Sequence, residues 1–196
     1  MKKSEEKKKL VYVMASPHAQ GTTQRLADAF LEPFRQSGRW QEHELRVYDV
    51  LPHPCTACGL CKEINGCRWH DLDEFDALLR DSDLLVVASP IYNLSFPAPM
   101  KAMLDRWQRY FEARFARGEK PCIQKGRKAV LLLTRGSKDA RGDDICRQQI
   151  SQSFSVMHTE LTGVCVWPGT DQGENGYEQA AERARAMALA IEKDLW

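Results

Sequence analysis

The chain has 196 residues, and its 28 Lys and Arg residues against 27 Asp and Glu residues give a formal net charge of +1. This balance provides no global field that would draw nucleic acid or an anionic membrane, so we expect neither as a partner. No apolar run approaches the length that spans a bilayer. We expect a single domain over residues 1–196, in which residues 1–9 form a charged tail. The apolar run after this tail is too short for a signal peptide, which predicts a cytoplasmic protein.

Five apolar runs predict the strands of a parallel sheet. The first run, residues 10–15, is apolar on both faces, as in a strand that is buried on both sides. The second run, residues 43–50, is more polar and is expected nearer the edge of the sheet. The remaining predicted strands cover residues 84–88, 129–133 and 161–167.

Amphipathic segments between and after these runs predict helices at residues 22–37, 71–80, 100–115, 143–158 and 177–195. Gly38 is expected to end the first helix, and Pro33 is expected to kink it or end it early. The third of these helices carries an apolar stripe that includes Trp107, Tyr110 and Phe111. Such a stripe is typical of a helix surface that faces the core or a second subunit.

Strand and helix patterns alternate five times, which predicts a doubly wound α/β sheet with right-handed crossovers. In such sheets ligands bind outside the carboxyl ends of the strands, where the strand order reverses. The loops after the first, third and fourth strands are the polar and unusual ones in this chain. We therefore expect the ligand site at these loops.

The first of these loops, residues 16–23, joins a buried strand directly to a helix. Gly21 allows close approach of the backbone, and a helix start offers free N–H groups and a positive dipole end that suit a phosphate. The hydroxyls of Ser16, Thr22 and Thr23 can add hydrogen bonds to the phosphate oxygens. The alternative is an ordinary turn between strand and helix. The loop has neither the GxGxxG pattern of dinucleotide-binding loops nor the G-K-[ST] ending of nucleoside-triphosphatase loops.

Four of the seven cysteines share one short segment with the spacing C-x2-C-x2-C-x5-C: Cys55, Cys58, Cys61 and Cys67. This crowding points to metal or redox chemistry rather than to structural disulfides. The tight triple is similar to the first three ligands of a four-iron ferredoxin motif, and the fourth cysteine can close the same [4Fe-4S] cluster. Zinc is less natural, because its sites usually use two separated cysteine pairs. The alternative is that all four are free thiols, as we expect for Cys122, Cys146 and Cys165.

Two stretches carry a resemblance to a known family. The first loop reads Ala15-Ser16-Pro17-His18-Ala19-Gln20-Gly21-Thr22-Thr23. The second stretch reads Ser89-Pro90-Ile91-Tyr92 and continues in the pattern P-x3-K-x3-D-R with Pro97, Lys101, Asp105 and Arg106. In both stretches the chain resembles the flavodoxin-like NAD(P)H-dependent FMN reductases. Its cysteine spacing is similar to that of the iron–sulfur flavoproteins, a branch of the same superfamily.

The resemblance implies a flavodoxin-like three-layer sandwich, in which helices cover both faces of a five-stranded parallel sheet of order 2-1-3-4-5. It also implies FMN as cofactor, NAD(P)H as co-substrate, and a homodimer or homotetramer. The residues implied to bind the FMN phosphate are Ser16, His18, Gln20, Gly21, Thr22 and Thr23. Those implied to line the ribityl chain and the flavin ring are Pro90, Ile91, Tyr92, Asn93 and Leu94, completed by Thr134, Arg135, Gly136 and Ser137. Lys101, Asp105 and Arg106 are expected to form structural ion pairs.

No group of side chains has the spacing of a general acid–base pair or of an activated nucleophile, so we assign no catalytic residue. A flavin explains this absence, because the cofactor itself carries the hydride and electron chemistry. The expected function is an oxidoreductase in which FMN takes a hydride from NAD(P)H and passes electrons to a flavin, a quinone or a similar small-molecule or electron-carrier acceptor. One alternative is an iron–sulfur flavoprotein that carries electrons without nicotinamide turnover. Another is a non-enzymatic flavodoxin-like module that has lost FMN. His18 supports it, because the family usually has Arg there and an unperturbed His is mostly neutral at pH 7.

Overall fold

The computed structural model describes residues 7–173 and 176–196, so residues 1–6 of the predicted charged tail lie outside the described residues. Five parallel strands form one sheet in the order β2-β1-β3-β4-β5, which confirms the predicted fold class. The strands are β1 (Lys8–Met14), β2 (Trp40–Arg46), β3 (Leu84–Pro90), β4 (Arg127–Arg135) and β5 (Thr159–Pro168).

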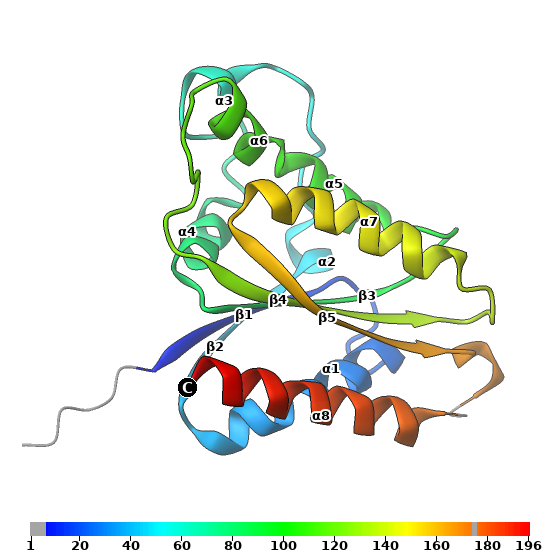
Figure 1. Cartoon of the computed structure of the whole chain (residues 1–196). Helices are drawn as coiled ribbons and strands as arrows, with labels where there is room; N and C mark the ends of the chain where they lie inside the picture. The colour runs from blue at the N-terminus through cyan, green and yellow to red at the C-terminus, as the bar shows by residue number, and fades with distance from the viewer. Residues whose placement is uncertain (1–6, 174–175) are drawn as a thin grey trace, which may run out of the picture.

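Helices cover both faces of this sheet, as Figure 1 shows. One layer holds α1 (Thr22–Ser37) and α8 (Tyr177–Leu195), and the other holds α4 (Asp73–Asp81), α5 (Ala98–Arg106), α6 (Gln108–Phe115) and α7 (Arg141–Val156). Side chains alternate between the two faces along each strand. In β1, Leu10, Tyr12 and Met14 pack with α1 and α8, whereas Val11 and Val13 pack with the other layer. Both faces of β1 are thus closed to water, which explains its apolar sequence.

The ends of α1 follow the expected local signals. Gly38 adopts the left-handed conformation with a φ of 65°, and its N–H bonds to the carbonyl of Arg35. This is the expected glycine stop. Pro33 lies inside α1 without ending it, because the helix continues to Ser37. None of the helices within the described residues is long and apolar enough to cross a membrane.

The second strand begins three residues earlier and ends four residues earlier than predicted. β2 ends at Arg46, and residues Val47–Val50 form the short helix α2. Arg46 pairs with Met14, the last residue of β1, so the chain beyond Arg46 has no neighbouring strand to continue the ladder. The prediction of a strand over residues 43–50 is therefore wrong in its second half. A further short helix, α3 (Leu60–Glu63), forms in the cysteine segment, where only a loop was expected.

The predicted helix at residues 100–115 is split into α5 and α6 at Trp107. The indole of Trp107 is buried at this junction, and Tyr110 is buried one turn later, so both belong to the core of their own chain. The apolar stripe is exposed only at Phe111, which packs against Phe115 with ring centroids 4.4 Å apart. Trp107 and Tyr110 thus contribute mainly to the core of their own chain.

A buried carboxylate joins α4 to α6. Asp76 accepts hydrogen bonds from the Tyr110 hydroxyl and from Arg80 Nε at 2.8 Å, and Arg109 lies 3.5 Å away. Burial, and then the charge of Asp76, raise the pKa of the Tyr110 hydroxyl well above its ordinary value. The hydroxyl therefore stays protonated at neutral pH and donates to Asp76.

Replacing Tyr110 by Phe removes this hydroxyl and keeps the ring. We expect the free energy of unfolding to fall by about 1–2 kcal/mol, because Asp76 loses one donor while its bond from Arg80 remains. Denaturant unfolding followed by tryptophan fluorescence measures the change. Tyr48→Phe deletes a half-buried hydroxyl on α2 and is the matched control. An equal loss in both variants would contradict the role of the Asp76 bond.

Candidate functional site

The carboxyl edge of the sheet brings together the loops after β1, β3 and β4. β1 lies between β2 and β3, so the strand order reverses at this edge. Pro90 at the end of β3 pairs with Thr134 of β4, and the Ile91 N–H donates to the Thr134 carbonyl at 2.8 Å. On the other side of β3, the Ala15 N–H donates to the Ala88 carbonyl at 2.8 Å. Backbone hydrogen bonds thus hold the starts of all three loops side by side.

The loop after β1 turns the chain tightly into α1. The buried Ser16 hydroxyl accepts the His18 N–H at 3.2 Å, and the Gly21 N–H donates to the His18 carbonyl at 3.3 Å. A Cβ at position 21 would lie 2.9 Å from the Cβ of His18, so this turn requires glycine although its φ is negative. Among the described residues no side chain caps the amino end of α1. The first N–H groups of the helix are therefore available to an external acceptor.

Thr23 ties the first loop to the third. Its hydroxyl lies 2.7 Å from the hydroxyl of Thr134, and both residues are 2% exposed. The Thr23 side chain thus fixes the start of α1 against the end of β4. Thr22 is half-buried at the first position of the helix, and His18 and Gln20 are exposed in the loop before it.

The loop after β3 is a tight turn. The N–H of Tyr92 donates to the carbonyl of Ser95 at 2.9 Å, and the N–H of Ser95 donates back at 3.0 Å. Between them, Asn93 and Leu94 have φ values of 50° and 65°, as a type I′ turn requires. This conformation is strained for Leu94 because its side chain is bulky, and such strain often marks a functional segment. Tyr92 is 42% exposed beside the turn.

Charged side chains fix the loop after β4. Arg135 Nε donates to the Asp143 carboxylate at 2.9 Å, and its Nη1 donates to the Ser137 carbonyl at 2.6 Å. A Cβ at Gly136 would overlap the Asp171 carboxylate, so Asp171 packs directly against the backbone of this loop. The Arg135 side chain is thereby held in place and is only 10% exposed.

Sequence reasoning missed three residues that shape this edge: Gly142, Asp143 and Asp171. A Cβ at Gly142 would lie 2.7 Å from the Ile91 side chain, so this glycine lets α7 pack against the second loop. The only signal in the sequence was the polar, glycine-containing character of the segments after β4 and β5. No local pattern pairs Asp143 with Arg135 or Asp171 with Gly136, because these pairings depend on the packing of α7 and β5.

Arg106 joins the cysteine segment to the end of α5. Its side chain is 3% exposed, and its Nη1 donates to the Asp71 carboxylate at 2.8 Å and to the His53 carbonyl at 3.2 Å. Its Nη2 donates to the Trp69 carbonyl at 2.7 Å. The Lys and Asp of the same P-x3-K-x3-D-R pattern pair with each other at 2.6 Å. The predicted structural ion pairs of this pattern are thus confirmed.

The four clustered cysteines line one cavity of about 240 Å³, which their segment forms with the end of α5 and with α6. Cys55 and Cys58 are exposed, and Cys61 and Cys67 are half-buried. All four are free thiols, and among the described residues no three His, Cys, Asp or Glu side chains are arranged to hold a metal ion. Burial, and then the nearby Glu112, raise the pKa of Cys61. The remaining cysteines are buried free thiols, as predicted: Cys122, Cys146 and Cys165.

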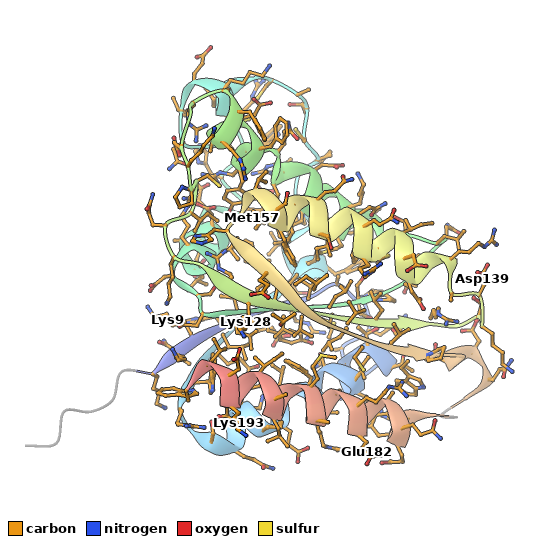
Figure 2. The ribbon with its side chains drawn as sticks, viewed as in Figure 1. Lys9, Lys128, Asp139, Met157, Glu182 and Lys193 are labelled. Atoms are coloured by element: carbon orange, nitrogen blue, oxygen red, sulfur yellow. The ribbon has the colours of Figure 1, made fainter. Side chains whose placement is uncertain are left out.

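The cysteine cavity and the three loops occupy different parts of the chain. Figure 1 shows α3, which lies within the cysteine segment, at the top of the view near α6, whereas the arrowheads of β4 and β5 point to the right. In Figure 2, Asp139, which lies in the third loop, is at this right-hand edge, and Lys9 and Lys128 lie toward the other end of the sheet. A substitution in the cavity is therefore not expected to alter the loops directly.

Asp71 anchors the cysteine segment as an ionised group. Although partial burial opposes its ionisation, hydrogen bonds from the His53 backbone N–H and from Arg106 lower the pKa of its carboxyl below the ordinary value of 3.8. A carboxyl whose pKa is lower in the folded state stabilises the fold fully above its unfolded pKa. This contribution is lost as the pH falls through the folded pKa, which lies below 3.8.

We expect Asp71→Asn to lower the free energy of unfolding at pH 7 by about 1–2 kcal/mol, because Arg106 loses a charged acceptor in a nearly buried position. The stability curves of the variant and the unmodified protein should converge as the pH falls through the folded pKa of Asp71, which lies below 3.8. Asp73→Asn, at an exposed pair with His70, is the matched control and should cost about 0.5 kcal/mol or less. A difference for Asp71→Asn that stayed constant through the acid range would contradict the lowered pKa.

Comparisons with known proteins agree with this geometry. The family described by a flavodoxin-like fold matches residues 8–190. An iron-sulfur flavoprotein of Archaeoglobus fulgidus is 32% identical over 186 residues, which cover 94% of this chain and 80% of the relative. The FMN-dependent NAD(P)H:quinone oxidoreductase 1 of Pseudomonas aeruginosa is 24% identical, with 93% of this chain and 97% of the relative covered.

Among solved structures, the NAD(P)H:quinone oxidoreductase from Methanothermobacter marburgensis matches with a TM-score of 0.69 at 18% identity. The match covers 95% of this chain and 96% of that chain, and at this identity it shows the fold. The strand order, the reversal point and the family match lead to one conclusion. This chain belongs to the flavodoxin-like fold family, and iron–sulfur flavoproteins and FMN-dependent quinone oxidoreductases are among its relatives.

Proposed function

We propose that this chain is an FMN-dependent oxidoreductase that takes a hydride from NAD(P)H and passes electrons to a quinone, a flavin or a similar acceptor. The observation that carries the proposal is the convergence of three loops at the reversal point of the sheet, tied by the hydrogen bond between Thr23 and Thr134. Doubly wound sheets bind their ligands at this point. The name of the Pseudomonas aeruginosa relative, which aligns with 93% of this chain, supports FMN, NAD(P)H and a quinone as the reactants.

The residues of the first loop fit the phosphate of FMN. The start of α1 has no acidic residue in its first turn and no capping side chain among the described residues, so it offers N–H donors and a positive dipole end. We propose the Ser16 hydroxyl, the Gly21 backbone and Thr22 as phosphate donors, with His18 and Gln20 at the exposed side. Thr23 has a positioning role through its bond to Thr134.

We propose that the ribityl chain and the flavin ring lie between the second and third loops. The exposed ring of Tyr92 offers an aromatic surface there, and the pair Arg135–Asp143 keeps the third loop rigid. FMN, when bound, supplies the hydride and electron chemistry. The chain binds the cofactor, orients it and limits access of water, which explains the absence of an acid–base set in the sequence.

Substitutions at the start of α1 test the phosphate site. Gly21→Val should weaken FMN binding about tenfold or more, because its Cβ meets the Cβ of His18 and displaces the first N–H groups. Thr22→Val should weaken it about fivefold, the loss of one neutral hydrogen bond. Thr162→Val, whose hydroxyl bonds to the Ala129 carbonyl between β4 and β5, is the matched control. Fluorescence titration with FMN measures the affinities, and equal affinities for all three variants would exclude this site.

The cysteine cavity favours a second function. We propose that Cys55, Cys58, Cys61 and Cys67 hold a [4Fe-4S] cluster. Each thiolate of such a cluster binds a different iron, so the ligands surround one small volume rather than meet at one ion. The four thiols line a single cavity and fit this requirement. With the cluster, the chain is an iron–sulfur flavoprotein, as the Archaeoglobus fulgidus relative is named, and can carry electrons without nicotinamide turnover.

Protein purified without oxygen distinguishes these functions. Bound FMN with rapid NADH or NADPH oxidation in the presence of a quinone supports the reductase. Bound FMN with four iron and four sulfide per chain, but without nicotinamide oxidation, supports the electron carrier. Colourless protein that does not take up FMN would contradict both and support the non-enzymatic module.

Cys58→Ser tests the cluster separately from the flavin. We expect the variant to lose iron and the broad brown absorbance and to keep FMN, because the cysteine cavity and the three loops lie in different parts of the chain. Iron and flavin content are measured on the same anaerobic sample. Cys122→Ser, at a buried thiol outside the cavity, should retain iron. Less than about one iron per chain in the unmodified protein would leave the four cysteines as free thiols.

We also propose that the chain acts in the cytoplasm as a homodimer or homotetramer. Seven free cysteines fit a reducing compartment. The neighbouring rings of Phe111 and Phe115 on α6 are 42% and 59% exposed, an apolar pair that a second subunit can cover. Light scattering of the purified protein measures the number of chains.

A further inference from the structure

Buried donors without an acceptor gather around the cysteine cavity. Within residues 7–173 and 176–196, eight buried side-chain polar atoms lack a hydrogen-bond partner, and three of them belong to residues that line this cavity. These three are Trp69 Nε1, Arg106 Nε and Arg109 Nε. A fourth, Arg117 Nη2, belongs to a residue whose Nη1 donates to the Cys61 carbonyl. Folded proteins leave few such atoms unpaired, so this concentration at one cavity indicates a missing acceptor.

The donors are nearly inaccessible to water. The side chains of Arg106 and Arg109 are 3% and 11% exposed. Both guanidinium groups also have partners: Arg106 donates to Asp71 and to the Trp69 carbonyl, and Arg109 Nη2 donates to the Asn65 carbonyl. Their Nε groups are buried and have no acceptor. Indole and guanidinium groups can donate but cannot accept, so the missing partner must be an acceptor.

The charge of the lining defines this acceptor further. Lys62, Arg68, Arg106 and Arg109 line the cavity with a single carboxylate, Glu112. A ligand that accepts hydrogen bonds from these side chains and carries negative charge matches the lining. A [4Fe-4S] cluster with four thiolate ligands has both properties, because its sulfur atoms accept hydrogen bonds.

We propose that Trp69, Arg106 and Arg109 donate hydrogen bonds to the sulfur atoms of a cluster held by the four cysteines, and that these bonds set its reduction potential. This inference rests on the cluster of the proposed function. Reduction adds one electron from an external reductant to the cluster, and no bond is formed or broken. The added negative charge strengthens each N–H···S bond, so the donors stabilise the reduced form and raise the potential.

Two substitutions remove the proposed donors of Trp69 and Arg109. Trp69→Phe deletes the indole N–H and keeps an aromatic ring to stack on His53, which lies 4.3 Å from the Trp69 ring. Arg109→Lys deletes the Nε–H together with the long Nη2 bond to the Asn65 carbonyl, and keeps a positive charge near Asp76. Trp107→Phe is the matched control, because its Nε1 also lacks a partner but Trp107 does not line the cysteine cavity. Arg106 is left unchanged, because its other hydrogen bonds hold the cysteine segment.

The measurement is an anaerobic redox titration with dithionite, in which the cluster and the flavin of the same sample are followed by their separate spectra. We expect each of Trp69→Phe and Arg109→Lys to lower the equilibrium constant for reduction of the cluster about tenfold, a fall in midpoint potential of about 59 mV for one electron. The flavin midpoint should stay constant, and Trp107→Phe should change neither potential. Loss of iron from either cavity variant, with full iron in Trp107→Phe, would also support the assignment.

Unchanged cluster midpoints at full iron content would overturn the assignment of these donors and leave the cluster itself intact. Absence of iron from the unmodified protein would overturn the proposed cluster and this inference together. A shift of the flavin midpoint equal to that of the cluster would also overturn the assignment, because it would indicate a global change rather than a lost bond to sulfur.

Discussion

Parallel pairing of β1, β3 and β4 determines where the polar residues of this chain meet. Because all three strands run in the same direction, their carboxyl ends meet at one edge, and three loops that are distant in the sequence become neighbours. The buried bond between Thr23 and Thr134 links the first loop to the third across this edge. The positions of the polar loops at the carboxyl edge therefore depend on an apolar sheet, which two layers of helices shield from water on both faces.

The cysteine segment is stabilised in a different way. It contains little regular structure, so side-chain hydrogen bonds take the place of a backbone ladder. Arg106 provides several of these bonds through Asp71, His53 and Trp69, and Arg117 provides another through the Cys61 carbonyl. The same part of α5 and α6 supplies the cationic lining of the cavity. Arginine side chains can thus stabilise the cysteine segment and also bind an anionic group in its cavity.

Hydropathy patterns were sufficient to predict a doubly wound parallel sheet, because apolar runs buried on two faces alternate with amphipathic helices. The strand order came from the resemblance to the flavodoxin-like reductases, and the sheet has that order. Hydropathy patterns were insufficient where tertiary partners decide the local structure. Residues after Arg46 form a helical turn because β1 ends opposite Arg46. The predicted third helix is interrupted at Trp107, whose N–H is shared between the carbonyls of Met103 and Leu104. The hydroxyl of Thr23 was expected to face a phosphate, yet it bonds to Thr134, a partner that only the packed sheet reveals.

A crystal structure of the anaerobically purified protein with FMN would locate the cofactor. We expect the FMN phosphate at the start of α1, in hydrogen-bond contact with the backbone of Gly21, and the flavin ring between the loops that hold Tyr92 and Gly136. FMN bound elsewhere on the molecule, or an unoccupied carboxyl edge at saturating FMN, would contradict this expectation.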